Sequence, residues 1–196
     1  MRTVLVTGFG AFPGAPRNPT EQLMARLLRH SARFGRLGVR LEARVLPVSF
    51  SSISQYLAGL ESDLRPDAIL HFGLASCRRW ISLETRAVNR VTTFFGDASG
   101  RLSKQTRIDS GPVFSRSTLS LSQIVARLGH LHQNIRLSGD AGRYLCNKTL
   151  YLSLTQSKAK AIGFIHVPPL KYVKGGATGL EACALAMILA SLPSTR

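Results

Sequence analysis

The stretch Ala161-Ile-Gly-Phe-Ile-His-Val-Pro-Pro169 indicates the fold class of this chain. It is short, almost continuously apolar and rich in residues that favour strands, and two prolines end it. These properties are typical of a buried strand in a largely parallel sheet. Five other segments have strand-like composition, namely Thr3–Thr7, Leu41–Leu46, Ala68–Phe72, Ile81–Val88 and Asn134–Leu137. Because helical patterns separate these segments, the sequence predicts an α/β fold.

Apolar residues recur with helical spacing between the predicted strands. The helices expected are Pro19–Arg29, Ser51–Leu64, Leu119–Leu131 and Ala177–Leu192. The first of them follows Asn18, a favourable N-cap residue, and has proline at its first position. We therefore expect a three-layer α/β/α sandwich with helices on both faces of a mixed, largely parallel, twisted sheet. No linker or repeat divides the chain, so residues 1–196 are expected to form a single domain.

The net charge of +16 is typical of proteins that bind nucleic acids. The arginines, however, are scattered along the chain rather than concentrated in one tract, and no helix-turn-helix, RNA-recognition or zinc signature is visible. The sequence favours a solvated basic surface, and a nucleic-acid partner is the alternative.

Cys146 lies in Gly142-Arg-Tyr-Leu-Cys-Asn-Lys-Thr-Leu-Tyr151, where an apolar segment gives way to a helix. The N-terminal end of a helix stabilises a thiolate, so we expect a lowered pKa for this thiol. His166, at the end of a predicted strand, can act as a base, and Glu84 can orient its ring. The alternatives are that Cys146 and His166 only pack in the core and that Glu84 only pairs with one of the nearby arginines, Arg78, Arg79 or Arg86.

The other chemically notable residues give no second site. Cys77 and Cys183 are expected to be inert, the first near a turn and the second on the apolar stripe of the last helix. His130 and His132 have no nearby acidic or cysteine ligand to complete a metal site. The Gly8-Phe-Gly10 loop lacks the third glycine and the downstream acid of a dinucleotide-binding turn, so it is interpreted as a substrate loop. We expect neither a metal nor a cofactor.

Five segments spread over nearly the whole chain form a recognisable series. They are Val6-Thr-Gly-Phe-Gly-Ala-Phe-Pro-Gly14 with Asn18-Pro19, Gly73-Leu-Ala-Ser-Cys-Arg78, Glu84-Thr-Arg-Ala-Val-Asn89, Tyr144-Leu-Cys-Asn147 and Gly163-Phe-Ile-His-Val-Pro168. In order and spacing they resemble the motifs of the pyroglutamyl-peptidase I family, also called pyrrolidone-carboxylate peptidases. The resemblance implies a cysteine peptidase that removes an N-terminal pyroglutamyl residue through a thioester. It assigns Cys146 as nucleophile, His166 as general base and Glu84 as orienting carboxylate.

The resemblance also implies how the substrate is held. The positions that match the family's substrate pocket are Phe9, Phe12, Tyr144 and Leu145. Arg78 is a candidate to help backbone N–H groups stabilise the oxyanion. The partners implied are a pyroglutamyl-peptide substrate and further copies of the same chain, in a dimer or tetramer.

Three segments depart from the family pattern, and the first is Gly10-Ala11, where the family usually has Asp-Pro. Ser76-Cys77-Arg78 replaces a Gly-Gly-Arg turn, and Val91-Thr-Thr-Phe-Phe-Gly-Asp-Ala-Ser-Gly100 replaces an I-P-D-N-x-G stretch. These changes leave open a family member with a changed substrate. A basic nucleic-acid-binding protein with a vestigial triad is the alternative from another functional class.

The sequence predicts a cytoplasmic protein. Its longest apolar stretch, Ala182–Leu192, is too short to cross a bilayer. The segment Met1–Thr7 meets Gly8 before an apolar region of signal-peptide length can form. The three cysteines form no CxxC pair, and a reducing compartment suits a working thiol.

Overall fold

A computed structural model describes residues 1–192 of the chain, with a six-stranded sheet at its centre. In spatial order the strands are β2 (Val39–Leu46), β1 (Arg2–Phe9), β3 (Ala68–Leu74), β8 (Ala161–Val167), β4 (Ile81–Glu84) and β7 (Ile135–Ser138). All neighbours pair in parallel except β4 and β8, which are antiparallel. The sheet is therefore mixed and mostly parallel, as the sequence predicts.

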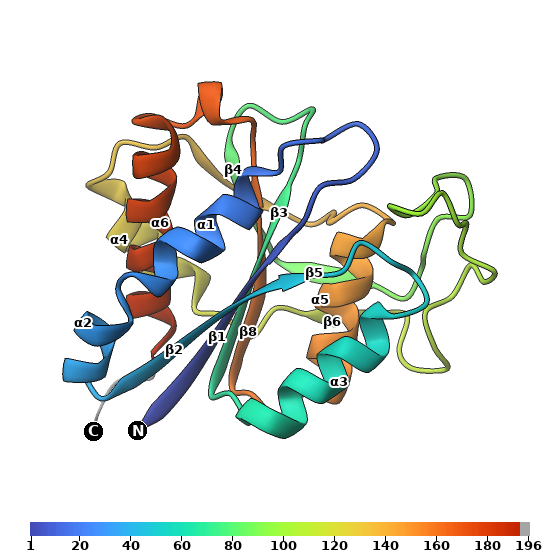
Figure 1. The fold of residues 1–196 in the computed structure, drawn as a ribbon, viewed down its shortest axis with the longest axis horizontal. Helices are drawn as coiled ribbons and strands as arrows, with labels where there is room; N and C mark the ends of the chain where they lie inside the picture. The colour runs from blue at the N-terminus through green and yellow to red at the C-terminus, as the bar shows by residue number, and fades with distance from the viewer. Residues whose placement is uncertain (193–196) are drawn as a thin grey trace.

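Helices cover both faces of this sheet (Figure 1). One face carries α1 (Pro19–Leu28), α2 (Ser31–Arg36), α4 (Leu121–Gly129) and α6 (Gly176–Ser191), and the other carries α3 (Ile53–Leu64) and α5 (Leu145–Gln156). A short 3-10 helix, Leu170–Tyr172, precedes α6. This arrangement confirms the three-layer α/β/α sandwich. None of the helices in the described part of the chain is long and apolar enough to cross a membrane.

The two faces of the sheet carry separate apolar clusters. Leu83 and Ile165 belong to the cluster under α1, α4 and α6, whereas Phe164 belongs to the cluster under α3 and α5. Because side chains alternate along a strand, His166 and Glu84 point to the same face as Phe164. The two polar residues therefore lie on the α5 side of the sheet.

The predicted strand Ile81–Val88 is wrong as a single element. The chain leaves the main sheet at Thr85, whose N–H donates to the Ser138 carbonyl over 2.7 Å. The following residues form β5 (Arg86–Val88), which pairs with β6 (Phe114–Arg116) in a separate two-stranded sheet. The sequence analysis did not predict β6 or α2, because both are short and carry few buried residues.

The start of α1 is held as its sequence predicts. The Asn18 side-chain oxygen accepts hydrogen bonds from the Thr20 N–H over 3.1 Å and from the Thr20 hydroxyl over 2.9 Å. Its amide nitrogen donates to the Gly10 carbonyl over 3.1 Å. Asn18 is buried, so it also ties the loop after β1 to the helix.

Replacing Asn18 with alanine should therefore destabilise the protein. The substitution removes an N-cap and leaves buried polar groups unpaired, so we expect Asn18→Ala to lower the free energy of unfolding by about 2 kcal/mol. Ser120→Ala is the matched control, because Ser120 precedes α4 without a capping hydrogen bond from its side chain. Urea denaturation of both variants measures the difference, and equal stabilities would contradict the role of Asn18.

Candidate active site

His166 of β8 and Glu84 of β4 lie on neighbouring antiparallel strands, and their side chains contact each other. His166 Nδ1 lies 2.7 Å from Glu84 Oε1, and both side chains are buried. The structure thus places the two residues in the contact that the sequence analysis expected. Because the carboxylate accepts only, the bond places the imidazole proton on Nδ1 and leaves Nε2 free to accept a proton.

Glu84 also pairs with Arg78, one of the arginines considered as its structural partner. Arg78 Nη1 donates to the same Glu84 oxygen over 2.6 Å, and Nη2 donates to the Asp140 carbonyl over 2.7 Å. A carboxylate with no exposed surface needs such a cation, since an unpaired buried charge is costly. Both interpretations of Glu84 therefore hold at once: it contacts the histidine and it forms an ion pair.

Cys146 is the second residue of α5, so it opens a helix as predicted. Its sulfur lies against Gly73 of β3, where the Cβ of any larger residue would come within 2.9 Å of Cys146 Sγ and 2.6 Å of Phe164 Cζ. Gly73 is the register neighbour of His166 in the parallel pairing of β3 and β8. The Cys146 thiol therefore lies beside Gly73, which is the neighbour of His166 on the adjacent strand. Glycine is needed at position 73 to make room for the sulfur.

The expectation of a lowered thiol pKa is wrong for the protein as it stands. Burial raises the pKa of Cys146 to about 12, and the negative charge of Glu84 acts in the same direction. The backbone N–H at the helix start and the Arg78 cation lower the pKa, but their effect is smaller. At neutral pH the thiol is therefore protonated before any reaction.

The four predicted pocket residues fall into two groups. Phe9 and Leu145 are buried in the apolar cluster, and Phe9 packs on Phe164 with ring centroids 6.3 Å apart. Phe12 and Tyr144 are partly exposed, and their ring centroids are 6.4 Å apart. Phe12 and Tyr144 are therefore accessible from solvent, whereas Phe9 and Leu145 are not.

Two residues beside the candidate site were not identified from the sequence. Phe164 lies next to the histidine, with the two ring centroids 4.8 Å apart. Asn147 is fully buried; its side chain accepts from the Val88 N–H over 2.9 Å and donates to the Val88 and Arg90 carbonyls. It attaches the chain after β5 to the start of α5. Asn147 directly follows Cys146 in the motif Tyr144-Leu-Cys-Asn147, and this position is the signal in the sequence that could have identified it.

The other two cysteines lie where the sequence analysis placed them. Cys77 is exposed in the turn after β3, and Cys183 is fully buried in α6. Within residues 1–192, no group of three histidine, cysteine, aspartate or glutamate side chains is placed to hold a metal ion.

Comparison with known proteins identifies the family. The family model described as pyroglutamyl peptidase matches residues 2–194. The chain belongs to this family of cysteine peptidases. The pyrrolidone-carboxylate peptidase of Pyrococcus furiosus is 36% identical over 170 residues, which cover 84% of this chain and 80% of the relative. That of Chromobacterium violaceum is 31% identical over 196 residues, with 97% and 91% covered.

Solved structures of the family agree with the fold. A mutant pyrrolidone carboxyl peptidase from Pyrococcus furiosus superposes with a TM-score of 0.88 at 30% identity, covering 96% of this chain and 97% of that chain. The enzyme from Thermus thermophilus has a TM-score of 0.84 at 29% identity, with 96% and 100% covered. The pyroglutamyl-peptidase fold therefore extends over nearly all of this family member.

The charges around Cys146 predict how fast the thiol is alkylated. Arg78 stabilises the thiolate, so Arg78→Gln should raise the pKa of Cys146 further and slow its reaction with iodoacetamide at any fixed pH around neutrality. In both proteins the rate should rise with pH, because the thiolate fraction grows below a pKa of about 12. A Cys77→Ser background removes the exposed thiol from the measurement.

Arg79→Gln is the control for this experiment. Arg79 neighbours Arg78 in the chain, but its guanidinium lies over the ring of Tyr172, 5.6 Å from the centroid. The control should therefore alkylate at the rate of the parent. Equal rates for Arg78→Gln and Arg79→Gln would refute the electrostatic role of Arg78.

Proposed function

We propose that this protein hydrolyses the peptide bond after an N-terminal pyroglutamyl residue, with Cys146 as nucleophile, His166 as general base and Glu84 as orienting carboxylate. The observation that carries the proposal is the 2.7 Å contact of His166 with Glu84, on the sheet face covered by α5, whose first turn contains Cys146. Membership of the pyroglutamyl peptidase family supports the same assignment.

The first half of the reaction forms a thioester. His166 Nε2 takes the proton of the Cys146 thiol while the sulfur bonds to the carbonyl carbon of the pyroglutamyl residue. The resulting imidazolium is stabilised by Glu84, and it then gives its proton to the leaving amine as the C–N bond breaks. Because the thiol is protonated at neutral pH, its deprotonation is coupled to attack rather than completed beforehand.

The second half of the reaction regenerates the thiol. A water molecule gives a proton to His166 Nε2 and attacks the thioester carbonyl. The C–S bond then breaks, the proton returns to the sulfur, and free pyroglutamate leaves. No cofactor takes part in either half.

Backbone N–H groups at the start of α5 are the proposed oxyanion donors. Tyr144, the N-cap residue of α5, makes no capping hydrogen bond with its side chain. The first N–H groups of a helix have no partner within the helix, and they carry the positive end of its dipole. Arg78 remains a predicted substrate contact. Its two hydrogen bonds, to Glu84 and to the Asp140 carbonyl, favour a second role in which it holds the carboxylate in place.

The proposed substrate group is a small, uncharged lactam. Such a ring has apolar methylene groups and one amide, so it fits aromatic walls with a few hydrogen bonds. Phe12 and Tyr144 are the partly exposed rings proposed to contact it, with Phe9 and Leu145 behind them. Arg78, which follows the altered Ser76-Cys77 turn, donates to Glu84. A family member with a changed substrate remains the alternative, and the assay with a pyroglutamyl anilide tests it.

We further propose a homo-oligomer, a dimer or tetramer, that works in the cytoplasm. Large apolar side chains are exposed in the segment between β5 and β6: Phe94 is 87% exposed and Val113 is 74% exposed. Surfaces of this kind are often covered by a partner chain. A cytoplasmic location would keep the Cys146 thiol reduced.

Cys146→Ser should abolish hydrolysis of a pyroglutamyl anilide, with a loss of about a thousandfold or more, because the hydroxyl is far less acidic and less nucleophilic than the thiol. The melting temperature should stay near that of the parent. The exposed Cys77, replaced by serine, provides the control and should retain full turnover. Substantial activity in Cys146→Ser would rule out the proposed nucleophile.

Glu84→Gln separates an orienting role from a purely structural one. The amide keeps the shape but loses the charge that stabilises the imidazolium, so we expect kcat to fall about a hundredfold with little change in KM. Glu181→Gln is the matched control, because Glu181 also pairs with an arginine and a histidine, Arg26 and His30, at a distant site. It should leave kcat unchanged. An unchanged kcat with a lower melting temperature in Glu84→Gln would leave only a Cys–His dyad.

A further inference from the structure

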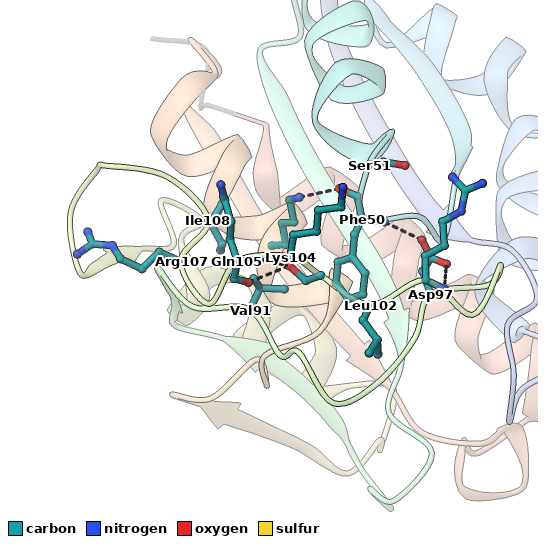
Figure 2. Close-up of a pocket in the computed structure, with 12 residues that line it drawn as sticks. Phe50, Ser51, Val91, Asp97, Leu102, Lys104, Gln105, Arg107 and Ile108 are labelled. Atoms are coloured by element: carbon teal, nitrogen blue, oxygen red, sulfur yellow. Dashed lines mark hydrogen bonds between the residues drawn. The ribbon is translucent and has the colours of Figure 1, made fainter.

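A cavity of about 710 Å³ lies beside the start of α5 and is not explained by the proposed chemistry. Its walls come from the loop after β2, from residues 91–108 and from one residue of α5 (Figure 2). The volume is in the range of sites that hold small ligands or short peptides. A lactam ring alone would fill only a small part of it.

Positive charge dominates the wall of this cavity. The basic residues lining it are Arg101, Lys104, Arg107 and Lys148, and Asp97 is the single acidic one among the described residues. The Asp97 carboxylate already accepts hydrogen bonds from the backbone N–H groups of Phe50, Ser99 and Arg101. These bonds and the Arg101 charge lower the pKa of Asp97, against the effect of burial. The negative charge of Asp97 is therefore already stabilised by backbone N–H groups of the protein.

Lys104 and Lys148, the two lysines of this wall, have no carboxylate partner in the described part of the chain. Within residues 1–192, neither Lys104 nor Lys148 forms an ion pair with a carboxylate. Lys148 is half-buried and donates one hydrogen bond, to the Phe50 carbonyl over 2.8 Å, which leaves two of its N–H donors. Burial lowers the pKa of Lys148. A partly desolvated ammonium of this kind gains from a carboxylate placed against it.

The cavity adjoins the proposed catalytic centre through Tyr144. The ring of Phe50, which lines the cavity, meets the ring of Tyr144 edge-on at 5.4 Å, and Tyr144 in turn meets Phe12. Tyr144 is the N-cap residue of α5 and precedes Cys146 by two residues, so it lies between the cavity and the start of the helix that carries the thiol. A row of aromatic rings thus leads from the proposed lactam pocket to the basic cavity.

We propose that this cavity binds the leaving part of the substrate and selects peptides with a carboxylate in the first few residues after the pyroglutamyl group. The proposal rests on the proposed function. A substrate of this enzyme can extend in one direction only, away from the lactam, and an extended chain gains about 3.3 Å per residue. The lactam is uncharged, so only the leaving chain can supply the anion that these lysines lack.

Four peptides test the preference. Pyroglutamyl-Ala-Glu-amide carries an acidic side chain, and pyroglutamyl-Ala-Gln-amide is its neutral counterpart. Pyroglutamyl-Ala-Ala with a free C-terminus and the same peptide as an amide test whether the terminal carboxylate serves equally well. We expect kcat/KM to be about fivefold higher for each acidic member of a pair at low ionic strength, and the difference to shrink in high salt.

Lys104→Gln shows whether the cavity causes the preference. Lys104 is exposed, points toward the Phe50 side of the cavity in Figure 2, and is not part of the proposed catalytic machinery. The variant should lose most of the preference for acidic peptides and keep its kcat/KM for the neutral ones. Lys158→Gln is the control: it also removes one positive charge, but from an exposed position just after α5 that does not line the cavity. This variant should keep the preference for acidic peptides. Melting temperatures of both variants verify that they fold.

The outcomes separate this inference from the proposed function. Cleavage of all four peptides at similar rates would overturn the inference and leave the proposed function intact. A preference that persists in Lys104→Gln, or that Lys158→Gln removes equally, would also overturn it, since the cause would then be the overall charge of the protein. Cleavage of none of the peptides would contradict the proposed function itself.

Discussion

The antiparallel pairing of β4 with β8 is the constraint on which the site depends. It places Ser82 opposite His166 and Glu84 opposite Phe164, so all four side chains lie on the α5 face. The parallel pairing of β3 with β8 adds Gly73 beside His166. A shift of one residue in the β4 register would turn Glu84 to the opposite face and remove it from the imidazole. Within residues 1–192, the only antiparallel pair of the six-stranded sheet is thus the one that assembles the histidine and the carboxylate.

The position of Cys146 depends on how α5 is held against this sheet. His71 of β3 connects Thr7 of β1 with Ser153 of α5, through contacts of 2.7 and 2.9 Å at its two ring nitrogens. Burial lowers the pKa of His71 to about 3, so the ring is neutral near neutral pH and can donate at one nitrogen and accept at the other. Ser153 lies two helical turns after Cys146, on the same side of α5. The hydrogen bonds of Ser153 and of Asn147 therefore set the rotation of α5 that directs the thiol toward β3.

The sequence was informative where one residue combines a chemical requirement with a position at the end of an element. Cys146 and His166 satisfy both conditions, whereas Glu84 was identified by its chemistry and by the family resemblance from inside the predicted strand Ile81–Val88; the structure places Glu84 and His166 in contact. The thiol pKa could not be predicted in this way, because the helix start is local whereas the burial that outweighs it comes from strands distant in sequence. For the same reason the close approach of Cys146 to Gly73 and the break at Thr85 were not predicted: both depend on tertiary pairing. The basic cavity likewise joins three separate segments of the chain.

Charge is distributed differently in the two parts of the proposed binding site. Around His166, the buried anion of Glu84 is matched by Arg78, so a neutral lactam can enter without exposing an uncompensated charge. In the adjoining cavity the basic residues exceed the acidic ones, and the oxygens of Asp97 are already occupied. Because interactions among buried charges are strong, removing Arg78 would leave burial and the Glu84 charge to oppose thiolate formation without a nearby cation. The electrostatic balance near the thiol therefore serves the chemistry, while the surplus positive charge farther along the row of aromatic rings remains available to recognise the leaving peptide.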